Sequence, residues 1–433
     1  MNAPPQTGTG AIAAVATSAA AVSDVAAGCL EKVRELDGAI GAFRVIDGDA
    51  VRSRAKELDD RVAGPLQGLM VGVKDVIDTA DLPTAYGSPL FSDHRPSADA
   101  DVVAALRRAG ALVLGKTEST EFALFHPTRT RNPVDASRTP GGSSSGSAAA
   151  VAAGMVPVAL GTQTAGSVVR PAAYCGVYGF KPSRGWASTA GIWLLSEQLD
   201  TVGLFARCAA DLTVLYGALQ TRPAGTADGD RRPAFRRVPP AVAVLAADEW
   251  GACDQEVHDA LRFVAGRLSD QGWDVREMRM PPSWRHLPAH HGTVMSVEVA
   301  KNLRARLGDR VAQISESAQA VIEQGDLCSA TKYLGALEAR EEARRLLAPL
   351  AVAADLVLAP SALGVAPEGL AFTGDPVMCR PWTLLGLPAA NVPAYRRGDG
   401  LPVGVQLVGL AGDDRSFLAD LALVETVLTQ KED

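Results

Sequence analysis

Two loops of small residues each contain a serine that could act as a nucleophile. Ser143 lies in the glycine- and serine-rich loop 141–146, and Ser167 ends the loop 161–167. A serine hydroxyl attacks a carbonyl carbon only when a nearby base takes its proton. Because neither loop contains a histidine, we expect the base to be a lysine, as in the Ser-Lys variants of the catalytic triad.

The candidate base is Lys74, which lies in the nearly continuous apolar segment Leu69–Ile77. Such a segment predicts a strand that is buried on both faces. A buried lysine is costly unless it pairs with an acid or gives up its proton. The residues alone leave both interpretations open: Lys74 forms a salt bridge with Asp75 or Asp78, or it is an uncharged base.

A helix and a strand connect the two loops. The alanine-rich segment 145–153 favours a helix, which Gly154 can end in a left-handed conformation. Residues 156–160 are apolar and predict a short strand. In a parallel sheet the second loop would then leave the carboxyl end of its strand, where open α/β sheets bind ligands. A nucleotide-phosphate loop is not indicated, because neither loop contains the lysine of G-x-x-x-x-G-K-[ST].

These segments resemble the amidase signature family. The sequences GGSSSGSA from Gly141 and GTQTAGSVVRP from Gly161 look like the two halves of its signature, and GFKPS follows from Gly179. The segment PLQGLMVGVKDVIDT around Lys74 resembles the lysine-bearing strand of the family. The resemblance covers residues 65–215 and 350–425.

The resemblance implies a triad of Ser167, Ser143 and Lys74, with a cis peptide bond before Ser143. Ser167 would attack an amide carbonyl while Ser143 relays the proton to neutral Lys74. Lys116, in another family-like segment, is expected to be structural. The oxyanion hole would consist of consecutive backbone amides, those of Thr164, Ala165, Gly166 and Ser167.

This chain departs from the common family loop at three positions. It has Gln163 where the family usually has Asp and Ala165 where it has Gly, and Arg170 stands three rather than two residues after the nucleophile. This version is similar to the malonamidase-like branch, in which that arginine holds a substrate carboxylate. We therefore expect Arg170, Gln163 and Gly142 to bind substrate. The alternative for Arg170 is an ion pair with an internal acid.

The expected fold is α/β: one large domain whose central twisted sheet is mixed but mostly parallel and is covered by helices on both faces. We divide the chain into an N-terminal helical arm, residues 1–64, and a core, residues 65–433. Within the core, residues 222–340 are expected to be a variable segment on the substrate side. Further helices are expected over 11–36 (as a pair), 49–62, 99–110 and 255–268, and from 294 and 330. Further strands are expected at 111–114, 196–204, 241–245 and 274–280, with disorder at 1–9.

The composition narrows the function classes. A net charge of −7 argues against nonspecific binding to nucleic acid or to an anionic membrane. Six cysteines without a C-x-x-C pair predict reduced thiols, and the absence of a signal-like or bilayer-spanning apolar run predicts a cytoplasmic protein. No carboxylate or cysteine at ligand spacing accompanies His286, His290 and His291, so no metal is expected there. An arginine cluster between prolines predicts a solvated loop: Arg231, Arg232, Arg236 and Arg237.

The resemblance to the amidase signature family implies an amidohydrolase that needs no cofactor. It would cleave the carbon-nitrogen bond of a small carboxamide, with or without a carboxylate, through a seryl acyl-enzyme and release ammonia or an amine. One alternative is a hydrolase of carbamates or urea derivatives, of the urethanase or allophanate type. Another is an A-type subunit of a tRNA-dependent amidotransferase. A homodimer is compatible with the sequence.

Overall fold

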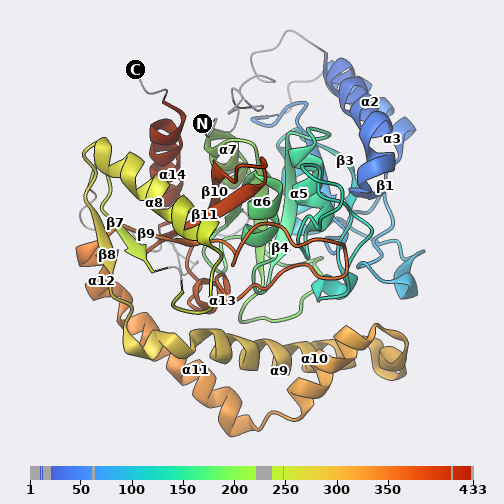
Figure 1. Cartoon of the computed structure of the whole chain (residues 1–433). Helices are drawn as coiled ribbons and strands as arrows, with labels where there is room; N and C mark the ends of the chain where they lie inside the picture. The colour runs from blue at the N-terminus through green and yellow to red at the C-terminus, as the bar shows by residue number, and fades with distance from the viewer. Residues whose placement is uncertain are drawn as a thin grey trace.

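The computed structural model of this 433-residue chain describes residues 10, 12, 21–60, 64–220, 237–246, 248–410 and 413–430. Its centre is an 11-stranded sheet with the order β1-β3-β2-β4-β6-β5-β10-β11-β9-β7-β8 (Figure 1). The strands are β1 Phe43–Val45, β2 Met70–Lys74, β3 Leu112–Thr117, β4 Val158–Gln163, β5 Tyr178–Lys181, β6 Thr201–Ala206, β7 Val242–Leu245, β8 Val275–Met278, β9 Leu356–Pro360, β10 Ala389–Arg396 and β11 Pro402–Gly409.

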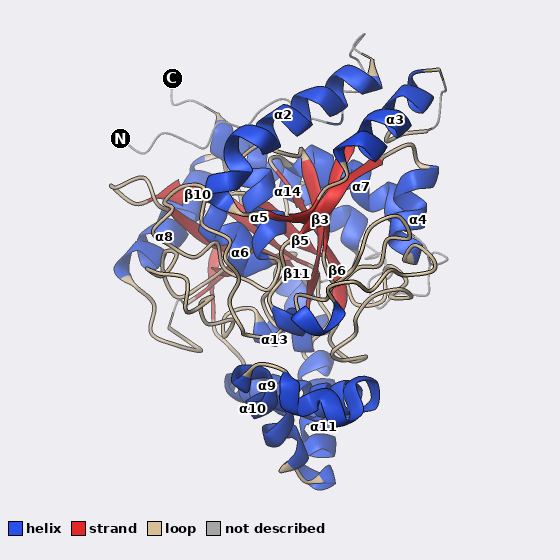
Figure 2. Cartoon of the chain, turned by 90° about the vertical axis from the view of Figure 1, so that its right-hand side faces the viewer, coloured by secondary structure: helices blue, strands red, loops and turns tan. Residues whose placement is uncertain are grey.

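Helices cover both faces of this sheet, as expected (Figures 1 and 2). They are α2 Val22–Ile40, α3 Gly48–Asp59, α4 Asp101–Arg108, α5 Ser145–Ala152, α6 Val169–Cys175, α7 Ala209–Leu219, α8 Gln255–Asp270, α9 Leu287–Leu307, α10 Glu316–Asp326, α11 Ala330–Arg345, α12 Leu347–Ala353, α13 Arg380–Leu384 and α14 Asp414–Thr429. A large apolar cluster joins α4, α7, α8 and α14 to one face, and a second cluster joins α2, α3, α5 and α6 to the other.

The expectation of a mostly parallel sheet is wrong. Only the groups β3-β2-β4 and β9-β7-β8 are parallel, and the other neighbouring pairs are antiparallel. Continuous apolar strands are typical of parallel sheets because helices cover both faces. Here the antiparallel strands β6, β10 and β11 are covered in the same way, so their apolar sequences report two-sided burial and not strand direction.

The N-terminal arm contributes to the sheet. Helices α2 and α3 pack together, and the short strand β1 between them pairs antiparallel with β3 at the sheet edge. Figure 1 shows both helices beside this edge. Several predictions lie outside the described residues. They concern residues 1–9, the first helix of the pair over 11–36, the end of the 49–62 helix, and the cluster members Arg231, Arg232 and Arg236.

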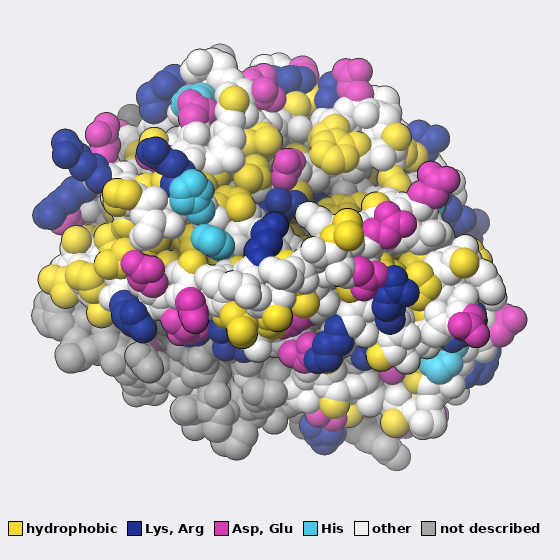
Figure 3. All heavy atoms as spheres, turned by 90° about the horizontal axis from the view of Figure 1, so that it is seen from below, with side chains coloured by type: hydrophobic (Ala, Val, Ile, Leu, Met, Phe, Trp, Pro, Cys, Tyr) yellow, Lys and Arg dark blue, Asp and Glu magenta, His cyan; other side chains and the backbone are white. Residues whose placement is uncertain are grey.

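Helices α9, α10 and α11 form a layer along one side of the molecule, below the sheet in the views of Figures 1 and 2. They lie in the segment 222–340 that is expected to be variable, except that α11 continues to Arg345. Helix α9 begins at Leu287, earlier than the predicted start near residue 294. On this face, described acidic and basic side chains are interspersed and form no continuous block of one sign (Figure 3). Within the described ranges, no helix is both long and apolar enough to cross a membrane.

Candidate functional site

The parallel pairing of β2 and β4 brings the predicted site residues together. Val73 pairs with Leu160, so the two strands end at the same edge of the sheet. Lys74 is the last residue of β2, and the loop containing Ser167 follows β4. The helix α5 connects the first serine loop to β4 and ends as predicted, with Gly154 at a φ of 71°. The strand itself begins at Val158, two residues later than expected.

Lys74 is completely buried and forms no ion pair with its sequence neighbours. Its Nζ donates to Ser143 Oγ at 2.7 Å and to Thr162 Oγ1 at 2.8 Å. Asp75 points to the opposite face of the strand, because successive side chains alternate, and it lies 3.9 Å from Lys116 Nζ. Desolvation by burial lowers the pKa of Lys74 to about 7, and the negative charge of Asp200 opposes this shift. The lysine is therefore uncharged in a large fraction of molecules near neutral pH.

Lys116, the other buried lysine of this region, has structural contacts. Its Nζ donates to Thr84 Oγ1 at 2.6 Å and to the carbonyl of Ile77. Burial lowers the pKa of Lys116 to about 8, while the carboxylate of Asp75 raises it. These partners all belong to the chain that follows β2, so Lys116 anchors that chain.

The peptide bond between Gly142 and Ser143 is cis. A Cβ on Gly142 would lie 3.1 Å from the methyl groups of both Thr120 and Thr373, so a larger residue does not fit without displacement. The carbonyl of Gly142 accepts a hydrogen bond from Arg170 Nη2 at 2.7 Å. Gly142 thus meets Arg170, and a side chain at this position would require its neighbours to move by a few tenths of an ångström.

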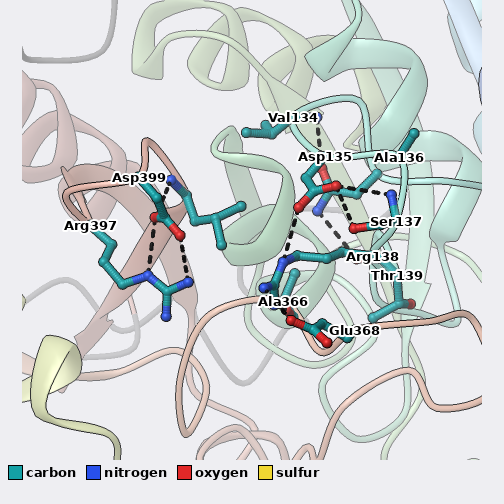
Figure 4. A network of polar contacts seen from close by, with 12 residues as sticks. Val134, Asp135, Ala136, Ser137, Arg138, Thr139, Ala366, Glu368, Arg397 and Asp399 are labelled. Carbon is teal, nitrogen blue, oxygen red and sulfur yellow. Dashed lines mark hydrogen bonds and ion pairs between the residues drawn. The ribbon is translucent and has the colours of Figure 1, made fainter.

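The side chain of Arg138 fixes the chain immediately before the first serine loop. Arg138 donates to Asp135 at 3.1 Å, to the carbonyl of Ala366 at 2.7 Å and to Glu368 at 2.9 Å (Figure 4). Asp135 lies in the chain before the serine loop, whereas Ala366 and Glu368 lie in the segment 366–374. Arg138 therefore connects the serine loop to that segment. That segment supplies Thr373 beside the cis peptide.

Ser167 lies in the turn between β4 and α6 and is 7% exposed. Its hydroxyl has no hydrogen-bond partner among the described residues, so the Ser143–Ser167 link of the predicted relay is not a hydrogen bond in this structure. Catalytic hydrogen bonds that are long in a ligand-free enzyme often tighten when substrate binds. The Lys74–Ser143 link is already formed.

The carbonyls of the loop 164–166 are all engaged within the protein. Thr164 O accepts from His291 Nε2 at 2.8 Å, and Ala165 O accepts from Thr383 Oγ1 at 2.8 Å. Gly166 O accepts from the backbone amide of Arg170 at 3.0 Å. By contrast, none of the four backbone amides from 164 to 167 has a partner within the described part of the chain.

Gln163 shapes this loop, and both ends of its amide are used. Oε1 accepts from the backbone amides of Val168 and Val169 at 2.8 and 3.1 Å, at the start of α6. Nε2 donates to Thr383 Oγ1 at 3.0 Å. The side chain is buried, so these contacts are those of a loop anchor and not of a group that is open to a substrate.

Arg170 is buried beside the first serine loop and forms no ion pair with a described acid. Apart from its bond to Gly142 O, Nη2 lies 3.5 Å from Thr373 Oγ1. Nε and Nη1 are buried and have no partner in the described ranges. Burial lowers the pKa of Arg170 from its ordinary value. The structure thus provides no internal ion pair for Arg170 among the described residues.

Sequence reasoning missed three residues that hold the second loop. Asp200 accepts hydrogen bonds from Thr164 Oγ1 at 2.6 Å and from the amide of Leu195 at 2.6 Å, and burial raises its pKa to about 6. His291 and Thr383 hold two loop carbonyls. Asp200 and Thr383 lie in family-like segments and could have been considered, whereas no local pattern marks His291.

Comparison with known proteins identifies the family. The model of the Amidase family matches residues 24–418. The chain is 35% identical over 445 residues to the A-type subunit of glutamyl-tRNA(Gln) amidotransferase from Thermus thermophilus, covering 93% of each chain. A crystal structure described as an amidase has a TM-score of 0.84, with 28% identity over 96% of this chain and 98% of the other. The native peptide amidase from Stenotrophomonas maltophilia has a TM-score of 0.79, with 27% identity over 97% of this chain and 96% of the other. The chain therefore belongs to the amidase family of hydrolases, enzymes that act on carbon-nitrogen amide bonds.

Proposed function

We propose that this chain hydrolyses the amide bond of a small carboxamide through an acyl-enzyme on Ser167. The observation that carries the proposal is the 2.7 Å contact between Lys74 Nζ and Ser143 Oγ. Lys74 has no acid partner among the described residues, and burial lowers its pKa to about 7. It can therefore accept a proton at neutral pH, which an exposed lysine with a pKa of about 10.4 does poorly.

In the first half-reaction, Ser143 passes its proton to the amine of Lys74 and takes the proton of Ser167. The Ser167 oxygen bonds to the amide carbon, and the carbonyl oxygen becomes an oxyanion. The unpartnered amides of the loop 164–167 are the donors that would stabilise it, and one such donor typically contributes about 3–4 kcal/mol.

The tetrahedral intermediate collapses when the carbon-nitrogen bond breaks. The proton held by Lys74 returns through Ser143 to the leaving nitrogen, which departs as ammonia or an amine. Water then enters, gives a proton to the same relay and attacks the acyl carbon. Ser167 leaves with a proton, so the second half-reaction releases a carboxylic acid and restores the enzyme.

We further propose that the substrate carries an anionic group, held by Arg170. Nε and Nη1 of this arginine are buried and unpartnered among the described residues, and a buried guanidinium without a partner is costly. A carboxylate beside the scissile amide would satisfy both donors in a bidentate pair. This feature agrees with the malonamidase-like sequence of the loop.

The experiment is a substrate screen with the purified chain alone. It compares primary amides, half-amides of diacids, anilides and carbamates, with Ser167→Ala and Lys74→Ala as controls. Hydrolysis of amides by the wild type and its loss in both variants support the proposal. Near wild-type turnover in either variant contradicts the mechanism, and a preference for carbamates favours the carbamate alternative.

A second candidate is the A-type component of a tRNA-dependent amidotransferase, because the curated relative from Thermus thermophilus carries that name at 35% identity over almost the whole chain. Hydrolysis of free amides by the isolated chain, without ATP or tRNA, separates the two functions. An amidotransferase component would instead need its partner proteins for full activity.

A further inference from the structure

We propose that His291 is a positioning residue that sets the orientation of the Thr164–Ala165 peptide and thereby directs one amide of the oxyanion hole. The inference rests on the proposed function, because it assigns a role within that site. His291 comes from helix α9, in the segment that no family motif covers.

The geometry of the peptide group links the carbonyl of Thr164 to the amide of Ala165. In a planar trans peptide, the C=O of one residue and the N–H of the next point in opposite directions. The described chain has cis bonds only at Gly142–Ser143 and Val238–Pro239, so the peptides of the second loop are trans. A donor that fixes Thr164 O on one side therefore fixes the N–H of Ala165 on the other.

The same relation holds along the loop. His291 fixes Thr164 O, Thr383 fixes Ala165 O, and the amide of Arg170 fixes Gly166 O. The N–H groups of the three following residues have no protein partner in the described ranges. Three successive peptides thus have their carbonyls satisfied by the protein and their amides without a partner in the described part of the chain, as an oxyanion hole requires.

The protonation state of His291 follows from its contact. A carbonyl oxygen only accepts hydrogen bonds, so the ring must carry a proton on Nε2 to bond Thr164 O at 2.8 Å. Nδ1 is buried without a partner among the described residues. Burial and the nearby charge of Arg380 lower the pKa of His291 to about 3, which keeps the ring neutral. The Nε2–H donor is therefore present throughout the pH range in which Lys74 titrates.

Helix α9 is itself fixed to the chain that holds Thr164 from the other side. Glu298 accepts from Ser196 Oγ at 2.5 Å and from the amide of Gln198 at 3.1 Å. That chain leads to Asp200, whose carboxylate accepts from Thr164 Oγ1. Thr164 is thus held through its carbonyl by α9 and through its hydroxyl by the chain that α9 contacts.

Helix α9 also packs against α13, which carries Thr383, the donor to Ala165 O. Figure 1 shows α13 between α9 and the sheet. Part of the variable segment expected on the substrate side therefore supports the chemical step. Changes in α9 should alter the rate of acylation even where they leave substrate affinity intact.

The test compares His291→Leu, which removes the donor, with His291→Gln, whose side-chain N–H can reach the position of Nε2. His290→Leu is the matched control, because it makes the same substitution one residue away, where the histidine side chain forms no hydrogen bond with any described residue. Two quantities are measured: the rate at which a fluorophosphonate labels Ser167, and kcat and KM for an amide that the wild type cleaves. Thermal unfolding checks that each variant is folded.

We expect His291→Leu to reduce the labelling rate and kcat by about tenfold to a hundredfold while KM changes little, since the loss of a whole oxyanion donor costs about 10²–10³ in kcat. His291→Gln should recover most of the loss, and His290→Leu should behave as the wild type. If His291→Leu does not fold, His291→Phe replaces it, since this change keeps a ring and removes only the donor.

Two results would overturn the inference while leaving the proposed function intact: wild-type labelling in a folded His291→Leu variant, or a His291→Gln variant that is as slow as His291→Leu. A wild-type protein that neither reacts with the fluorophosphonate nor cleaves amides would instead remove the proposed function, and this inference with it.

Discussion

Lys74 Nζ lies 2.7 Å from Ser143 Oγ, and no described carboxylate lies within ion-pair distance of this lysine. The activity should therefore follow the titration of a lysine that must be neutral to accept a proton. Burial lowers the pKa of Lys74 to about 7, so kcat/KM should rise with pH through an apparent pKa of about 7 and then level off. A pH profile of the wild type checks this, and a rising limb centred near pH 10 would contradict it.

Burial of Lys74 should also lower the free energy of unfolding, by an amount that depends on pH. Between the folded pKa of about 7 and the unfolded value of about 10.4, the unfolded chain binds more protons, so wild-type stability rises with pH. Lys74→Met removes the charge, so the variant should be inactive yet more stable than the wild type at pH 6–7. This advantage should shrink toward pH 10. Denaturant unfolding at several pH values measures the difference in stability between the variant and the wild type. A difference that grows with pH would refute the lowered pKa of Lys74.

Gln163 should tune the same titration. Replacement by Glu keeps an acceptor for the amides of Val168 and Val169 but adds a negative charge one residue after Thr162, on the opposite face of β4 from the Thr162 hydroxyl that bonds Lys74. A negative charge favours the protonated lysine, so the rising limb of the pH profile should move up by roughly 0.5–1 pH unit. Gln163→Met is the control without charge. Gln163→Met should lower the rate, because the loop loses its anchor, but it should leave the rising limb of the pH profile at the wild-type pH. An equal shift of that limb in both variants would exclude the electrostatic explanation.

The sequence located Lys74 and the two serine loops, which the structure brings to one edge of the sheet, because the patterns that mark them are local. Lys74 ends a continuous apolar strand, and the serines lie in short loops whose glycines are visible without a structure. Strand direction could not be predicted, because helices cover parallel and antiparallel strands alike. His291 could not be found either: it is 127 residues from Thr164 in sequence, and a histidine on a helix has no pattern that marks its partner. The resemblance alone leads to a substrate role for Gln163, and its contact with Thr383, 220 residues away, has no local signal in the sequence.

Arg170 should discriminate between anionic and neutral substrates. If its unpartnered donors hold a carboxylate, Arg170→Met should reduce kcat/KM for a half-amide of a diacid by about a hundredfold more than for a neutral amide of the same length. Both substrates should lose some activity, because the variant also loses the bond to Gly142 O. Parallel kinetics on the two amides measure the difference. Equal losses would assign Arg170 to support of the first serine loop alone.

Gly142 should tolerate no side chain unless its neighbours are reduced. In Gly142→Ala, the new methyl would lie 3.1 Å from the Thr120 and Thr373 methyl groups and 3.2 Å from Ser145 Oγ, so we expect a loss of about 1–3 kcal/mol of stability together with activity. Thr373→Ser removes one opposing methyl and keeps the hydroxyl. Combined with Gly142→Ala, it should therefore restore part of the stability, whereas alone it should change little. A double-mutant cycle by denaturant unfolding gives the coupling energy, and strictly additive effects would show that the Thr373 methyl is not what excludes the side chain.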